Sequence, residues 1–171
     1  MIYIVVLNWN GAIDTINCVK SLMDLNVSDY KIIIVDNCSM DNSYDTIKEN
    51  LNSLYIADKS IIEVKSEDRN KYKTLENDKI ILIQSPQNNG YASGNNIGIE
   101  FALNQENMKY VWVLNNDTEV DKEALTHLIS KCDSDKSIGI CGSRLVYFAD
   151  REMQQGLGGV HNKWSVSYTH L

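Results

Sequence analysis

The sequence lacks an excess of basic residues: 16 lysines and arginines stand against 23 aspartates and glutamates, for a formal net charge of −7. A nucleic-acid-binding protein usually presents a basic face, so we expect no nucleic-acid partner. An acidic protein can still bind a nucleotide diphosphate when a divalent cation offsets the negative charge. The charge balance therefore argues against nucleic-acid binding and leaves small anionic ligands open.

Long apolar runs are also missing. The longest, at 2–7 and 79–83 with their neighbours, are far shorter than the roughly 20 residues that cross a bilayer. The N-terminal residues enter a strand-like run directly, without the basic region or the cleavage site of a signal peptide. These absences predict a cytoplasmic protein with no membrane segment in this chain.

The four cysteines lack the spacing of a metal site. Cys18, Cys38, Cys132 and Cys141 form no CxxC pair and have no histidine at the spacing of a zinc ligand. Cysteine is among the residue types most often buried. We therefore expect reduced, mostly buried thiols.

What the sequence does contain is an alternation of strand and helix patterns. Apolar runs typical of buried strands lie at 2–7, 31–35, 80–83 and 110–114, and a fifth begins at 138–141. Between and after these runs, apolar residues at helical spacing indicate helices near 12–23, 44–54, 97–102 and 124–129. This alternation predicts an α/β fold with a mostly parallel sheet flanked by helices.

Two segments depart from the alternation. Residues 57–78 are rich in Lys, Asp, Glu and Asn, so we expect a polar, solvated insertion between the second helix and the third predicted strand. Residues 165–171 show neither a helix stop signal nor an amphipathic pattern, and we expect a disordered or non-native tail there. The remainder, residues 1–164, is predicted to be one domain.

Polar residues follow each of the first four predicted strands, at 8–11, 36–41, 88–96 and 115–118. In a parallel α/β sheet, ligands bind beyond the carboxyl ends of the strands. Each cluster alone would also fit ordinary turn chemistry, since Asn, Asp, Ser and Gly are turn residues. Four such clusters at one edge of one sheet instead predict a polar crevice.

Two carboxylates and a glycine pair give this crevice its chemistry. Asp36 can accept a hydrogen bond from the imide N–H of a pyrimidine base, or cap a helix. Asp117 can bind Mg²⁺ or Mn²⁺ beside substrate phosphates, or cap a turn. Gly90 and Gly94 would let the backbone approach a ligand ahead of a helix N-terminus, which favours anions, or form an ordinary loop.

The four motifs together resemble glycosyltransferase family 2, and within it the rhamnosyltransferase-like branch. They are Asn8-Trp9-Asn10-Gly11, then Val35-Asp36-Asn37 with Ser39 and Asp41, then Asn89-Gly90-Tyr91-Ala92 with Gly94, Asn95 and Asn96, then Leu114-Asn115-Asn116-Asp117-Thr118. The resemblance extends from Met1 to about Gly159. It implies an incomplete GT-A (Rossmann-like) nucleotide-sugar-binding domain over 1–164, truncated before the acceptor half.

The resemblance also implies an activity. A UDP- or dTDP-sugar would donate a hexose, with inversion, to a glycan or lipid-linked acceptor in cell-surface polysaccharide synthesis. Such an enzyme would work in the cytoplasm, free or at the inner face of the membrane, and this fragment alone would be inactive.

Residue roles follow by position. The family's DxD motif falls on Asn115-Asn116-Asp117, with asparagine in place of the first aspartate, and Asp117 would bind the divalent cation (Mg²⁺ or Mn²⁺). The donor-binding residues would be Asn8, Trp9, Asn10, Asp36, Ser39, Asn89, Gly94, Asn96, Asn115, Asn116 and Asp117. The general base of the family lies beyond these motifs, and the late acids Asp150 and Glu152 read as loop residues.

Other functional classes fit less well. A sugar nucleotidyltransferase needs a glycine-rich loop with a cation after the first strand, where Asn8-Trp9-Asn10-Gly11 contains no Lys or Arg. A dinucleotide oxidoreductase would have GxGxxG at this position. A non-catalytic sugar-nucleotide-binding module stays open, and its binding would not depend on Asp117.

Overall fold

The computed structural model describes residues 1–54, 60–74, 76–156, 159–162 and 167–170. The chain divides into two compact units, Met1–Lys122 and Glu123–Leu171, and each is described by itself. The predicted donor-site motifs all lie in the first unit.

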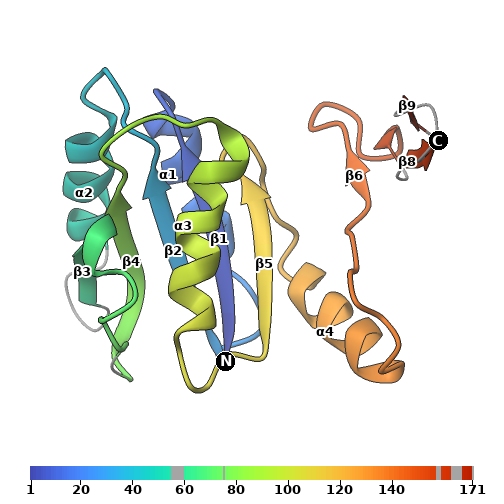
Figure 1. The fold of residues 1–171 in the computed structure, drawn as a ribbon. Helices are drawn as coiled ribbons and strands as arrows, with labels where there is room; N and C mark the ends of the chain where they lie inside the picture. Colours follow the sequence, from blue (N-terminus) through green and yellow to red (C-terminus); the bar gives the residue numbers. More distant parts are fainter. Residues whose placement is uncertain (55–59, 75, 157–158, 163–166, 171) are drawn as a thin grey trace. The chain divides into compact units, whose positions relative to one another are not determined.

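The first unit is built around a parallel sheet of five strands in the order β3-β4-β2-β1-β5 (Figure 1). The strands are β1 (Ile2–Asn8), β2 (Tyr30–Asp36), β3 (Ser60–Lys65), β4 (Asp78–Gln84) and β5 (Tyr110–Asn115). The helices are α1 (Ala12–Met23), α2 (Ser43–Leu54) and α3 (Tyr91–Leu103), with a short 3₁₀ helix at Ser66–Asp68. The prediction of a mostly parallel sheet flanked by helices is confirmed.

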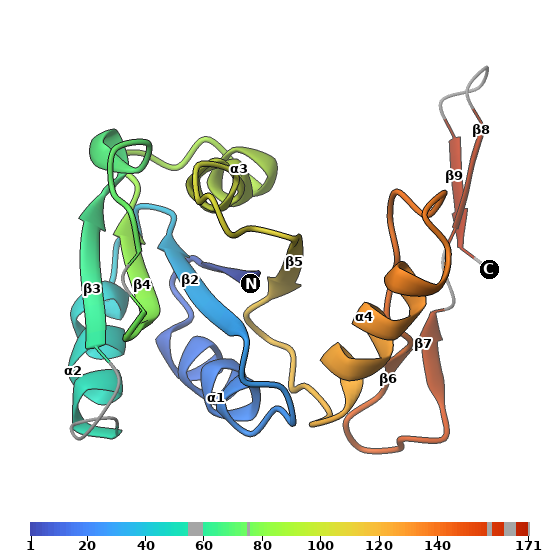
Figure 2. The same ribbon diagram turned by 90° about the horizontal axis from the view of Figure 1, so that it is seen from below.

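Helices cover both faces of this sheet. In Figure 2, α3 lies on one face, and α1 and α2 lie on the other. Tyr3, Val5 and Leu7 of β1 belong to one buried cluster with Phe101 and Ala102 of α3. Successive side chains of a strand point to opposite faces, so the alternate residues of β1 face α1 and α2. Every residue of β1 and β2 is buried, which explains their continuous apolar runs.

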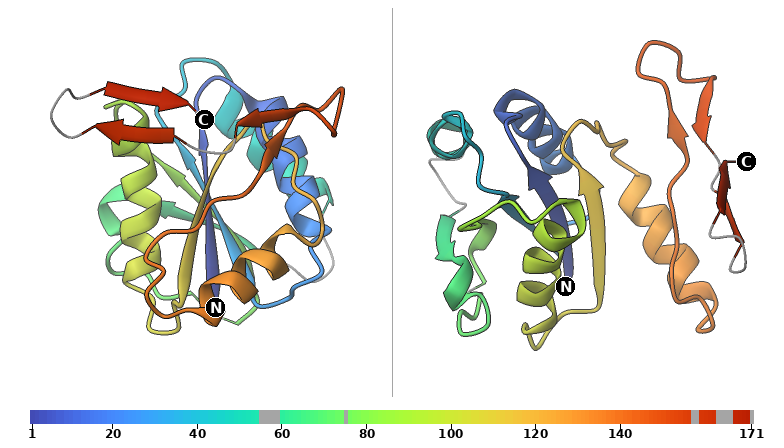
Figure 3. Two further views of the ribbon diagram at one scale, coloured as in Figure 1. Left: turned by 90° about the vertical axis from the view of Figure 1, so that its right-hand side faces the viewer. Right: turned by 45° about the horizontal axis from the view of Figure 1, so that its top comes forward.

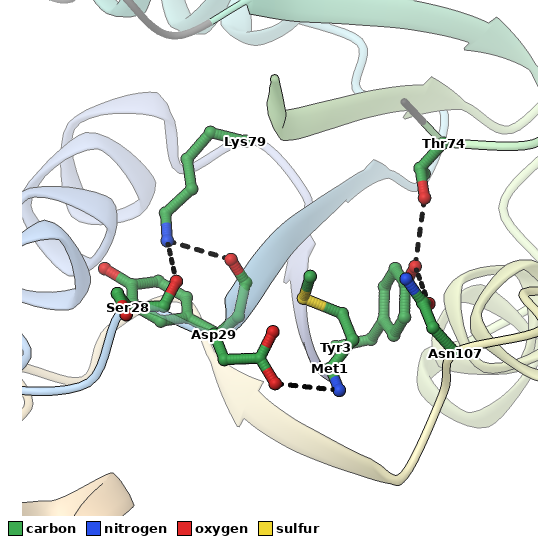
Figure 4. Close-up of polar contacts among 8 residues, drawn as sticks. Met1, Tyr3, Ser28, Asp29, Thr74, Lys79 and Asn107 are labelled. Atoms are coloured by element: carbon green, nitrogen blue, oxygen red, sulfur yellow. Dashed lines mark hydrogen bonds and ion pairs between the residues drawn. The ribbon is translucent and has the colours of Figure 1, made fainter. Parts of the chain in front are cut away.

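The amino ends of the strands are closed by polar contacts (Figure 4). The N-terminal amine of Met1 pairs with Asp29 at 3.0 Å. The Tyr3 hydroxyl donates to Asn107 Oδ1 at 3.0 Å and lies 3.0 Å from the hydroxyl of Thr74. Lys79 Nζ contacts the carbonyls of Ser28 and Tyr30 at 3.4 and 2.8 Å. These contacts fix the loops at this edge and leave the opposite, carboxyl edge as the place for a site.

The described residues of the second unit form α4 (Ala124–Ser134) and four short strands. The strands are β6 (Leu145–Val146), β7 (Gln154–Gly156), β8 (Gly159–Asn162) and β9 (Ser167–His170). They pair as two antiparallel hairpins, β6 with β7 and β8 with β9 (Figure 3). Asp150 and Glu152 lie exposed between β6 and β7, where the Glu152 N–H donates to Asp150 Oδ1 at 3.0 Å, so both are loop residues as predicted. No helix in the described ranges is both long and apolar enough to span a membrane.

Two expectations differ from the structure. The predicted strand at 138–141 is wrong: these residues form no strand, and Ile140 is almost fully exposed, because a short run interrupted by Gly139 has no pairing partner. The segment 57–78 is not only a solvated insertion, since 60–65 form the edge strand β3 with Val64 buried. Residues 57–59 and 75 lie outside the described residues.

The predicted tail is described only in part. Residues 165, 166 and 171 lie outside the described residues, whereas Ser167–His170 form β9. A non-native origin of this segment stays a prediction.

Candidate functional site

Three adjacent strands bring the predicted motifs to one edge of the sheet. The register pairs Asn8 of β1 with Asp36 of β2, and Leu7 of β1 with Asn115 of β5. Because β1 lies between β2 and β5, its C-terminal residue stands between the two predicted carboxylate motifs. Asp36 and the turn that carries Asp117 therefore share one rim of the sheet.

Asp36 is fully buried, and the protein itself occupies both of its carboxylate oxygens. Its Oδ1 accepts hydrogen bonds from Asn8 Nδ2 at 2.7 Å and from the Ser39 hydroxyl at 2.5 Å. Its Oδ2 accepts the backbone N–H of Ser39 at 3.1 Å. Asp36, Asn8 and Ser39 thus form one hydrogen-bonded unit, and a direct contact between Asp36 and a base stays a prediction.

A buried threonine extends this network toward the end of β5. The Thr15 hydroxyl of α1 is fully buried, donates to Asn8 Oδ1 at 2.8 Å and accepts from Asn116 Nδ2 at 3.1 Å. Asn116 Nδ2 also donates to the carbonyl of Gly11 at 3.3 Å. A Cβ on Gly11 would lie only 2.7 Å from this amide nitrogen, so glycine is required for the contact.

Thr15 was missed by the sequence analysis. The signal that identifies it is a polar residue on the buried face of an amphipathic helix, next to Ile16 and Val19. Such a residue needs hydrogen-bond partners inside the protein. Its partners here are two of the predicted donor-site residues, Asn8 and Asn116.

The loops that follow β1 and β2 hold each other in a fixed conformation. The backbone N–H of Asn10 donates to the Ser39 hydroxyl at 2.9 Å, and Asn10 Oδ1 accepts the N–H of Met40 at 2.8 Å. Asn10 and Cys38 both have positive φ, of 52° and 57°. Non-glycine residues rarely adopt this conformation, and where it occurs it is often associated with function. Trp9, in the loop that follows β1, is exposed.

A groove of about 440 Å³ adjoins these loops, between the first turns of α1 and α2. Its lining comes from the segments that follow β1 and β2. The lining residues are Asn10, Gly11, Ala12, Ile13, Asp14, Asp41, Asn42, Ser43 and Thr46. Two predicted donor motifs thus border one open space at the carboxyl edge.

The cluster between β4 and α3 combines exposed side chains with a closely packed glycine. Asn89 and Asn96 are exposed on the surface, where a ligand has access to them. Gly90 has φ of 89° and precedes α3, as a sharp turn into the helix requires. Gly94, in contrast, is buried, and a Cβ there would lie 2.5 Å from Leu7 Cδ1. Close packing of α3 on β1 therefore accounts for a glycine at position 94, and a contact of Gly94 with the donor stays a prediction.

The turn after β5 presents Asp117 to solvent. Within the described part of the chain, its carboxylate has no hydrogen bond or ion pair, and no cluster of three or more His, Cys, Asp or Glu side chains is suited to a metal ion. A single free carboxylate fits Mg²⁺ or Mn²⁺, because such ions take further ligands from water and substrate phosphates. The neighbouring Asn115 Oδ1 accepts the Tyr91 hydroxyl at 2.7 Å.

Cys18 lies directly under this turn. Its thiol is buried and points to the carbonyl of Asn115, with Sγ at 3.8 Å from the oxygen. Burial, and then the negative charge of Asp117, raises the pKa of the Cys18 thiol to about 12. The thiol therefore stays protonated and is not a nucleophile of this site.

A parallel sheet flanked by helices, with polar strand ends gathered on one rim, is typical of α/β proteins that bind a ligand at the carboxyl ends of their strands. The sequence profile of Glycosyl transferase family 2 matches residues 3–157. Since the match covers most of the chain, the chain belongs to this family.

The low-salt glycan biosynthesis hexosyltransferase Agl10 of Haloferax volcanii is similar to part of the chain. The two are 33% identical over 106 residues, which is 60% of this chain and 32% of the relative. The chain thus spans about a third of the length of this curated relative.

Two solved structures have the same fold. One is the mannosyltransferase PcManGT from Pyrobaculum calidifontis in complex with GDP-Man and Mn²⁺ (TM-score 0.59, 12% identity, 84% of this chain and 35% of that one). The other is TarS 1-349 of S. aureus in complex with UDP (TM-score 0.55, 14% identity, 84% and 39%). At these identities the likeness establishes the GT-A fold alone.

Proposed function

We propose that this chain is the donor-binding part of an inverting glycosyltransferase. The donor would be a UDP- or dTDP-hexose, and the acceptor a hydroxyl of a glycan or lipid-linked molecule in cell-surface polysaccharide synthesis. The observation that carries this proposal is the shared rim: Asn8 and Asp36 on one side, and Asn116 with the exposed Asp117 on the other, joined through buried hydrogen bonds. A cytoplasmic location, free or at the inner face of the membrane, belongs to the same proposal.

The relatives support a nucleotide-sugar donor. One is a hexosyltransferase by name, and two structural neighbours were solved with UDP and with GDP-Man and Mn²⁺. The rhamnosyltransferase-like branch rests on the four motifs and stays part of the proposal. On this chain the base would lie beside the loops that carry Trp9, Asn10 and Ser39.

Asp117 is the residue proposed to hold Mg²⁺ or Mn²⁺, with the donor diphosphate as the remaining anionic ligand. The bound cation would offset the charge on the diphosphate as the sugar leaves. Tyr91 holds Asn115 through its hydroxyl, so Asn115 keeps a fixed place next to this carboxylate.

Inversion requires a single displacement. The acceptor hydroxyl attacks the anomeric carbon from the face opposite the diphosphate and loses its proton to a general base. No described residue is assigned as this base, because the late acids Asp150 and Glu152 lie in a surface turn. We therefore propose that this chain alone binds the donor but transfers sugar slowly or not at all.

Titration of the 171-residue chain with UDP and dTDP, with and without Mn²⁺, tests the proposal, and the exposed Trp9 provides a fluorescence signal. We expect binding that depends on Mn²⁺ and weakens by about tenfold or more in Asp117→Asn. The matched control is Asp24→Asn, an equal charge change on an exposed carboxylate at the far end of α1, which should bind as the wild type does. Absence of binding to either nucleotide with Mn²⁺ would refute the proposal. Binding that is indifferent to Asp117 would favour the non-catalytic module.

A further inference from the structure

We propose that Thr15 is a positioning residue that fixes Asn116, and through it the place of Asp117 relative to Asn8 and Asp36. This inference rests on the proposed function of the same rim. Thr15 itself is fully buried, so it acts only through the residues that it holds.

Asp36 sets the direction of the hydrogen bonds that run from Asp36 through Asn8 and Thr15 to Asn116. A carboxylate only accepts hydrogen bonds, so the Asn8 amide must present Nδ2 to Asp36, at 2.7 Å. The carbonyl oxygen of Asn8 then faces the Thr15 hydroxyl at 2.8 Å, and the Gly11 carbonyl is a second acceptor of the same hydroxyl at 3.0 Å. The contact with Asn8 is the shorter of the two, and it is the one that links α1 to the end of β1. The Thr15 oxygen keeps its lone pairs for Asn116 Nδ2, at 3.1 Å.

This direction explains the residue type at position 116. The side chain there meets two acceptors, the Thr15 hydroxyl oxygen and the Gly11 carbonyl at 3.3 Å, and must therefore donate. Asparagine can donate to both, whereas an ionised aspartate would place its own acceptor oxygens against them. Asn116 is thus bound to the body of α1, while Asp117, the next residue, faces solvent.

The consequence concerns the two halves of the proposed donor site. Asn8 and Asp36 stand at the ends of β1 and β2, and Asp117 follows β5, so their spacing must match the distance from base to diphosphate. The Thr15 hydroxyl is the buried atom that joins these strand ends by side-chain hydrogen bonds. Without the Thr15 hydroxyl, Asn116 keeps only its hydrogen bond to the Gly11 carbonyl.

The experiment compares Thr15→Val, Thr15→Ser and Val19→Ala in the 171-residue chain. Valine keeps the shape of threonine without its hydroxyl, and serine keeps the hydroxyl without the methyl group. Val19 is buried on the same helix one turn further on, outside the network, so Val19→Ala controls for loss of stability alone. The probes are UDP with Mn²⁺, and uridine, which has the same base without the diphosphate.

We expect Thr15→Val to weaken Mn²⁺-dependent UDP binding by about tenfold and uridine binding much less, since partners that orient a metal ligand typically act at this scale. Thr15→Ser and Val19→Ala should both bind UDP within about twofold of the wild type, because each keeps the network. Equal UDP binding by Thr15→Val and the wild type would overturn this proposal alone. The proposal would also be overturned if Thr15→Val weakened UDP and uridine binding equally. The same holds if Val19→Ala weakened UDP binding as much as Thr15→Val does.

A readout without ligand separates this inference from the proposed function. In NMR spectra of the free protein, the side-chain amide protons of Asn116 should exchange slowly with solvent in the wild type, Thr15→Ser and Val19→Ala, and faster in Thr15→Val. Absence of UDP binding by the wild type would refute the proposed function, and with it the role of Thr15 toward the donor. Unchanged exchange in Thr15→Val would show that the hydroxyl does not hold Asn116 and overturn the inference directly.

Discussion

Replacing Gly94 by alanine should destabilise the protein even though alanine is the better helix former. A Cβ at this position would lie 2.5 Å from Leu7 Cδ1 and 3.1 Å from Asn37 Cγ. Ordinary contacts begin near 3.4 Å, so the neighbours must shift by about 1 Å in a packed core. Overpacking of this kind costs about 1–3 kcal/mol, against a gain in helix propensity of about 1 kcal/mol. The net effect should therefore be a loss of up to about 2 kcal/mol.

Urea unfolding of the 171-residue chain, followed by circular dichroism, measures this loss as a lower midpoint with an unchanged slope. The decisive comparison is a cycle with Leu7→Ala, which removes the atom that the new methyl group would strike. Leu7→Ala alone should cost about 2–4 kcal/mol, because Leu7 is buried. In that background Gly94→Ala should be neutral or stabilising, for a coupling energy of about 1–2 kcal/mol. A gain of about 1 kcal/mol from Gly94→Ala in both backgrounds would refute the packing argument.

Two further predictions concern titratable groups. Hydrogen bonds from Lys48, at 2.7 Å, and Tyr44, at 2.8 Å, lower the pKa of Glu63 on β3. Their contribution is therefore present at pH 7 and lost as the pH falls through the lowered pKa. Glu63→Gln should lower the free energy of unfolding by only about 0.5 kcal/mol at pH 7, because the Lys48–Glu63 pair is solvent-exposed. At pH 2 the substitution should have no effect. Thermal melts at both pH values test this, and an equal loss at the two would contradict it. Separately, the pKa of about 12 leaves about one Cys18 thiol in ten thousand ionised at pH 8, so Cys18 should react with a maleimide far more slowly than the half-buried Cys38. In a time course of maleimide labelling, Cys18 should therefore give a slow phase, which Cys18→Ser should remove. A native protein that is labelled without a slow phase would show that this thiol is not buried.

The strands of the sheet were predictable to the extent that both of their faces are covered. β1 and β2 are buried at every position, and their sequences contain the continuous apolar runs 2–7 and 32–35. β3 was missed because it is an edge strand in which Glu63 and Lys65 alternate with apolar residues, so the composition of 57–78 as a whole hid it. The run at 138–141 has the opposite property, since it is apolar but has no strand to pair with.

Most residues of the candidate site could be predicted from the sequence, but the hydrogen bonds between them could not. Asn8, Asp36 and Asn116 were predicted from the polar residues that follow successive strands, and the structure brings them to one rim. Which of these side chains bind each other depends on tertiary distances that no local pattern encodes. Thr15 therefore escaped notice, because one polar residue on a helix carries no signal until its buried partners are known.

The charge of the rim argues for the role of a cation in donor binding. The polar segments predicted after the first four strands, 8–11, 36–41, 88–96 and 115–118, contain three aspartates but no lysine or arginine. Asp36 is buried there with its charge stabilised by hydrogen bonds alone. A diphosphate approaching this rim meets negative charge and has no basic side chain in these segments to bind. A divalent cation would reverse this repulsion, and the exposed Asp117 is the carboxylate that we propose to bind it.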